Sequence, residues 1–139
     1  MTDQALMLAA VLLPFAGAAG ILLCDRWPNL REAVTLLTAG SLGLNVITLN
    51  RRMQDGAALA RQLAEPLPGL PLRLEIEPLG KLIALAASVL WLNTSIYSIG
   101  YMRAHHEKNQ TRFYALFAVA IGSTMGVAFA GNLFTLFLW

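Results

Sequence analysis

The sequence predicts an all-α membrane protein: four transmembrane helices, the start of a fifth, and either a small β-hairpin or an irregular loop in the 50–78 section. Hydrophobic residues make up 57% of the chain and charged residues only 13%, whereas soluble domains carry roughly 25% charged residues. Four apolar runs also approach or reach the roughly 17–25 residues that cross a bilayer as a helix. We expect a single transmembrane domain over residues 1–139, truncated within a further element.

The first two apolar runs are expected to pair as a helical hairpin. The first covers residues 5–24 and contains Pro14 followed by a cluster of Ala and Gly. A bilayer helix tolerates such residues because neighbouring helices satisfy the freed backbone groups. The second run covers residues 33–49, and residues 25–32 between them are predicted to form a short polar turn. Cys24, at the end of the first run, is interpreted as a small buried thiol.

Residues 50–78 form the one long polar section. Prolines and a glycine between residues 66 and 71 predict a turn. Residues 72–77 alternate apolar and charged side chains with a period of two, which is typical of a half-buried strand. Residues 58–64 can pair with this strand as a β-hairpin, and an irregular loop lying on the membrane surface is the alternative.

Two stripes of small residues predict helix contacts in the remaining runs, which cover residues 79–99 and 113–130. Residues spaced at three or four share a helical face, and small residues allow membrane helices to approach closely. A break at Gly131 and Asn132 precedes the start of a fifth helix at 132–139. The stripe of the third run is Ala84, Ser88, Trp91, Ser95 and Ser98, and that of the fourth is Ala118, Gly122, Gly126 and Ala130.

The chain contains no recognisable catalytic constellation, so we predict no enzyme activity and no catalytic, cofactor-binding or metal-ligating residue. The predicted spans contain no ionisable side chain except Lys81, which lies at the start of the third span and can extend its ammonium to the interface. His105 and His106 are adjacent on a polar turn and are interpreted as solvated. Six polar residues at depth are interpreted as interhelical hydrogen-bonding groups: Asn45, Asn93, Thr94, Ser95, Ser123 and Thr124.

Charge indicates how the chain meets its surroundings. The net charge of +2 is not gathered into a basic patch, which argues against nucleic-acid binding. Lys and Arg are equally frequent on the two sides of the predicted topology. The set on the short turns lies closest to the helix ends, where the positive-inside rule applies most strongly. We therefore expect cytoplasmic short turns and an extracytoplasmic N-terminus.

Three short motifs carry a resemblance to a known family: SIGYMR at residues 98–103, RFY at 112–114 and AGNLFTLF at 130–137. From about Ile76 onward the chain resembles the N-terminal part of the antiporter-like subunits of respiratory complex I, membrane-bound hydrogenases and Mrp-type cation/proton antiporters. Within this group it is most similar to the D-type member of the Mrp antiporters. Before Ile76, only the two-span hairpin and the following loop correspond.

The resemblance implies a proton-conducting subunit of a hetero-oligomeric complex in the cell inner (plasma) membrane, which couples proton movement to that of a monovalent cation such as sodium. It implies a larger bundle with inverted repeats and broken helices. A fifth helix would begin at Asn132 and carry a glutamate just beyond Trp139, paired with a lysine on a later helix. The chain would then be a fragment without the principal proton-handling residues. Glu77 would cap the third helix, and Arg112 would be an interfacial anchor.

Two alternatives remain open. The first is the same segment of an antiporter-like subunit in complex I or a membrane-bound hydrogenase, part of an NADH-quinone oxidoreductase without redox residues of its own. The second is a small membrane scaffold protein that transports nothing and docks larger subunits through its small-residue stripes.

Overall fold

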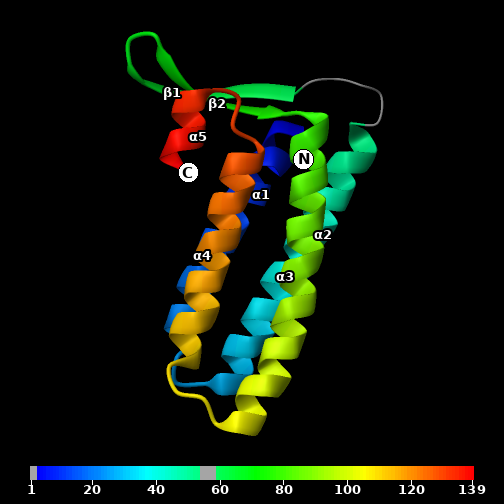
Figure 1. Cartoon of the computed structure of the whole chain (residues 1–139), viewed down its shortest axis with the longest axis vertical. Coiled ribbons are helices and arrows are strands. Elements are labelled where there is room, and N and C mark those ends of the chain that lie inside the picture. The colour runs from blue at the N-terminus through cyan, green and yellow to red at the C-terminus, as the bar shows by residue number, and fades with distance from the viewer. Residues whose placement is uncertain (1–2, 54–58) are drawn as a thin grey trace.

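The computed structural model describes residues 3–53 and 59–139. Its four long helices form an antiparallel bundle (Figure 1). All four are long and apolar enough to cross a membrane, so the predicted all-α membrane fold is confirmed. The elements are α1 (Asp3–Leu23), α2 (Pro28–Arg52), β1 (Leu59–Leu67), β2 (Leu70–Ile76), α3 (Pro78–His105), α4 (Gln110–Ala128) and α5 (Leu133–Leu138).

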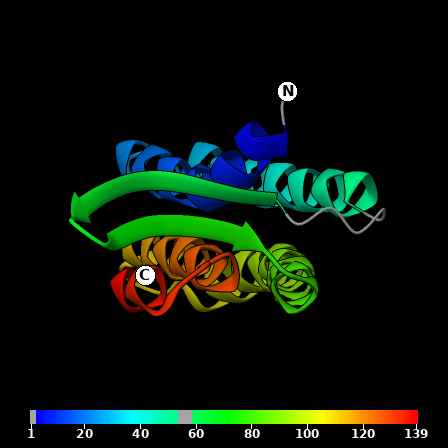
Figure 2. The ribbon, with the colours of Figure 1, turned by 90° about the horizontal axis from the view of Figure 1, so that it is seen from above.

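Each long helix packs against two neighbours around the bundle. Helix α1 contacts α2 and α4, and α3 contacts the same two helices. Figure 2 shows α1 and α2 on one side, α3 and α4 on the other, and the β-hairpin lying across the end of the bundle. We call this the hairpin end. The opposite end, where residues 24–27 and 106–109 connect the helices, is the short-turn end.

The α3 stripe and three of the four residues of the α4 stripe lie on buried helix faces, as predicted. All five residues of the α3 stripe are buried. On α4, a Cβ placed at Gly122 would lie 2.7 Å from Cε2 of Phe15, so this glycine allows α1 and α4 to approach closely. Ala118 and Gly126 are also buried. Ala130 lies beyond the end of α4 and pairs with Leu74 in an isolated β-bridge.

The β-hairpin hypothesis is confirmed against the loop alternative. Strands β1 and β2 pair antiparallel from Leu59 opposite Ile76 to Leu67 opposite Leu70. Gly69 takes a positive φ of 85° in the turn, which glycine adopts without strain. Leu74 and Ile76 are buried whereas Arg73 is exposed, in agreement with the period of two. Residue 58, which we expected in the first strand, lies outside the described residues.

The predicted turn at residues 25–32 is wrong from Pro28 onward. Helix α2 begins there, because proline fits the first helical position, where its missing N–H leaves no hydrogen bond unmade. Helix α3 likewise continues to His105, and α4 begins at Gln110. The apolar runs underestimate these helices because their ends carry charged and polar residues that find partners inside the protein.

Lys81 and Glu77 both lie at the start of α3, and only Glu77 differs from expectation. The Lys81 Nζ donates to the backbone oxygen of Met53 at 2.9 Å, which ties α3 to the end of α2. Glu77 does occupy the N-cap position of α3, but its side chain makes no capping hydrogen bond. Cys24 is only partly buried, in the turn after α1.

Candidate functional site

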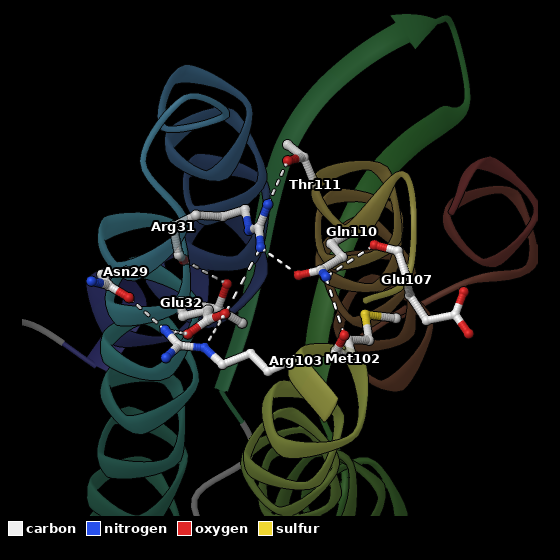
Figure 3. Close-up of polar contacts among 9 residues, drawn as sticks. Asn29, Arg31, Glu32, Met102, Arg103, Glu107, Gln110 and Thr111 are labelled. Carbon is white, nitrogen blue, oxygen red and sulfur yellow. Dashed lines mark hydrogen bonds and ion pairs between the residues drawn. The ribbon is translucent and has the colours of Figure 1, made fainter. Parts of the chain in front are cut away.

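Three charged residues meet at the short-turn end, where Arg31 and Glu32 lie near the start of α2 and Arg103 lies in the last turn of α3 (Figure 3). Nε of Arg103 donates to Oε1 of Glu32 at 3.0 Å, and Nη2 of Arg103 pairs with Oε2 of the same carboxylate. This is the two-pronged geometry of the strongest Arg–carboxylate pairs. We call these residues the Arg31–Glu32–Arg103 cluster.

Arg31 extends the cluster to α4. Its Nη1 donates to Oγ1 of Thr111 at 3.0 Å, and its Nη2 donates to Oε1 of Gln110 at 2.7 Å. The guanidinium also lies 5.4 Å from the centre of the Tyr114 ring, within the range of a cation–π contact. Arg31 is only 6% exposed. Its charge is therefore held inside the bundle by partners on α2 and α4, and the cluster joins α2, α3 and α4.

The antiparallel order of the helices explains why these residues meet. The first turns of α2 and α4 and the last turn of α3 all lie at the short-turn end. Glu32 near a helix N-terminus and Arg103 near a helix C-terminus are each favoured by the helix dipole. Sequence reasoning missed the cluster because it assigned Arg31 and Glu32 to a solvated turn. Pro28 was the available signal, since proline is common at the first helical position.

An open pocket of about 680 Å³ lies beside the cluster. The cluster residues line it together with His106, Gln110 and Arg112, among others. Arg112 is exposed. The arginines and carboxylates that line this pocket are equal in number. The donors of Arg31 and Arg103 that face Glu32, Thr111 and Gln110 are already occupied. The arrangement is suited to locking helices together.

The histidines lie at the margin of this site. The ring of His105 stacks on Tyr101 with centroids 4.3 Å apart, and its Nδ1 lies 3.0 Å from the backbone oxygen of Tyr101. His106 ends α3 with a positive φ of 50°. Both side chains are exposed, as expected, although His105 belongs to α3 and not to the predicted turn. Among the described residues, no group of three or more His, Cys, Asp and Glu side chains could hold a metal ion.

The polar residues at depth do not form the interhelical hydrogen bonds that we expected. Oγ1 of Thr124 donates to the backbone oxygen of Ala120 at 2.8 Å, within its own helix. Ser95 Oγ and Asn45 Oδ1 are buried without a hydrogen-bond partner among the described residues. Asn93 is exposed on the outside of α3. Ser95 therefore serves the α3 contact face through the small size of its side chain, and not through a hydrogen bond.

A second polar arrangement lies at the hairpin end, where residues 129–132 form the α4–α5 junction. The backbone N–H of Glu75 donates to the oxygen of Phe129 at 2.7 Å, and that of Gly131 donates to the oxygen of Arg73 at 2.8 Å. Through these bonds the junction covers the edge of β2 that β1 leaves open. The path of the chain between α4 and α5 is thus set by the hairpin.

Two side chains fix the start of α5 on the hairpin. Asn132 Oδ1 accepts from the N–H of Thr135 at 2.7 Å, and its Nδ2 donates to the oxygen of Pro71 at 2.6 Å. Oγ1 of the fully buried Thr135 accepts from the N–H of Arg73 at 2.9 Å. Trp139 then packs against Gly126 of α4. The first turn of α5 is therefore held by the hairpin and the bundle together.

No family model matches the chain, and no curated protein matches it either. A functional proposal for this chain therefore depends on its motifs and on the two polar arrangements, the Arg31–Glu32–Arg103 cluster and the α4–α5 junction.

Proposed function

We propose that the chain is the N-terminal segment of a proton-conducting membrane transporter subunit, similar to the D-type member of Mrp-type monovalent cation/proton antiporters. The observation that carries this proposal is the position of the break between α4 and α5. The family resemblance implies a fifth helix starting at Asn132, and α5 begins at Leu133 with Asn132 as its N-cap. The motif at residues 130–137 spans this start.

The α4–α5 junction gives the proposal a mechanical basis. In the family, the fifth helix carries a proton-handling glutamate close to the position of Trp139. A functional group works at a defined depth only if its supporting element is held rigidly. Asn132 donates a hydrogen bond to the hairpin and Thr135 accepts one from it, and these bonds supply this support at the start of α5. We assign the hairpin and junction to the positioning of that helix.

The Arg31–Glu32–Arg103 cluster has a supporting role in this proposal. Its charges are paired with one another and with Gln110 and Thr111, so it locks three helices. The basic residues of the short-turn end lie next to helix ends, which favours a cytoplasmic location. The proposed subunit belongs to a hetero-oligomeric complex in the cell inner (plasma) membrane. Its hairpin and its N-terminus lie on the extracytoplasmic side of that membrane.

Transport measurements test the proposal. In everted vesicles containing the complete set of subunits, addition of sodium is expected to dissipate a preformed proton gradient, and deletion of this chain should abolish that response. Thr135→Val should slow the response about fivefold, because an unpaired Arg73 N–H costs about 1–3 kcal/mol and weakens the junction. A pH-sensitive dye follows the rate.

Thr124→Val is the matched control. The hydroxyl of Thr124 bonds only within its own helix, to Ala120 at 2.8 Å, and should be dispensable. The transport proposal is wrong if neither sodium nor any other monovalent cation dissipates the proton gradient more in vesicles with the chain than in vesicles without it. If Thr135→Val and Thr124→Val change the rate of the sodium response equally, the role assigned to the α4–α5 junction is wrong.

A further inference from the structure

The outward face of α3 carries a heptad pattern. Its residues are separated by four, three, four, three and four positions, which matches the a and d positions of a left-handed helix pair. All of them are exposed, on the side opposite the buried α3 stripe. We call this set the α3 seam, and it consists of Leu82, Ala86, Val89, Asn93, Ile96 and Gly100.

Asn93 distinguishes the α3 seam from a simple lipid-facing surface. It lies near the middle of the uncharged run between Lys81 and Arg103, and therefore near the middle of the bilayer. Its side chain is exposed, and no hydrogen bond joins its amide to another described residue. Hydrocarbon offers an amide no hydrogen bond, and such transfer costs about 4–8 kcal/mol from water to cyclohexane. Contact with lipid explains the exposure of the apolar Leu82, Val89 and Ile96, but not the exposure of the polar Asn93.

We infer that the α3 seam is the interface between two copies of this chain, paired in parallel through Asn93. A carboxamide carries both donors and an acceptor, so Asn93 can hydrogen-bond to its own counterpart. Two copies inserted in the same orientation place this residue at the same depth. A single polar residue at an a position is known to set the register of such helix pairs.

The rest of the seam is also self-complementary. In a parallel pair, a positions face a positions and d positions face d positions. The small residues Ala86 and Gly100 then flank the Asn93 layer at one heptad on either side, and branched apolar residues form the layers between. A Cβ at Gly100 would meet nothing within 4 Å, which leaves room for a second helix. A second copy presents an amide at the same depth between the same small residues, so it satisfies the hydrogen bonding of Asn93 and fits the seam.

This inference goes beyond the proposed function and requires only that α3 spans the membrane. Its test is cysteine crosslinking of the full chain in native membranes, on a Cys24→Ser background. Single cysteines at Ala86, Val89 and Ile96, which leave the Asn93 amide in place, should give disulfide-linked dimers on oxidation. The exposed but off-seam controls Ile83 and Leu90 should give little or none.

A second measurement separates the amide from the general apolar surface. Förster transfer between labelled copies in vesicles should be lost in Asn93→Leu and retained in Asn93→Gln, which keeps the carboxamide. Thr48→Val, at another exposed polar position in α2, should leave the transfer unchanged. Because Asn93 is exposed in the single chain, thermal unfolding of the detergent-dispersed monomer should be the same for the leucine variant and the parent chain.

Three outcomes would overturn the inference. Crosslinking of equal strength at all positions around α3 would indicate random encounter. Unchanged Förster transfer in Asn93→Leu would show that a pair of Asn93 amides does not hold the two copies together. Crosslinking of the seam only to a different polypeptide would assign the face to another partner. None of these outcomes depends on proton transport, so failure here is distinguishable from failure of the proposed function.

Discussion

Glu32→Ala is expected to lower the free energy of unfolding by about 3 kcal/mol, at the lower end of the range for breaking a buried ion pair. The substitution leaves Arg31 buried at 6% exposure with one carboxylate fewer, and removes both hydrogen bonds of Arg103 to Glu32. We expect a loss at the lower end of that range because the Arg103 side chain is 52% exposed, so water can hydrate its guanidinium once Glu32 is gone. Chemical unfolding in detergent micelles, followed by tryptophan fluorescence, measures the loss.

Asp3→Ala provides the control for Glu32→Ala. The ion pair between Asp3 and Arg52 joins side chains that are 44% and 48% exposed, at 3.2 Å. Such surface pairs contribute about 0–1 kcal/mol. An equal loss of stability in the two variants would contradict the structural role of the Arg31–Glu32–Arg103 cluster.

Gly80→Val is expected to destabilise the hairpin end of the bundle by about 3 kcal/mol, the upper part of the usual range for overpacking. A Cβ at Gly80 would overlap the backbone oxygen of Ala128, which terminates α4. A backbone atom cannot rotate away as a flexible side chain can, so α3 and α4 must separate. The same unfolding experiment reports the change.

Gly43→Val is the matched control for Gly80→Val. Nothing lies within 4 Å of a Cβ placed at Gly43, so α2 accommodates the new side chain in the surrounding lipid. The close contact of α3 with the end of α4 would be refuted by two variants of indistinguishable stability.

The helices and their contact faces were predictable because both depend on local periodicity. The spacing of Ala84, Ser88 and Trp91 identified the buried face of α3 before any partner was known. The break at Asn132 was equally visible, since its side chain caps the next helix. Such signals are contained in a few consecutive residues.

The two polar arrangements were not predictable in the same way. Arg73 and Thr135 are 62 positions apart, and Arg103 and Glu32 are 71 apart. A hydropathy pattern places every charged residue outside the membrane-spanning helices, whereas a charged residue with a well-placed partner can lie inside the bundle. The helix ends around Arg31 and Arg103 were therefore assigned to turns, although their hydrogen bonds keep them in the bundle.

The coding sequence beyond Trp139 offers the most direct test of membership in the antiporter-like family. We expect an open reading frame that supplies a glutamate within a few residues, in the continuation of α5. Further apolar spans should follow, one of them with an intramembrane lysine, because an ionisable side chain inside a membrane span marks a transport path. A stop codon directly after Trp139, in a gene whose product accumulates stably in the membrane, would contradict the transporter assignment.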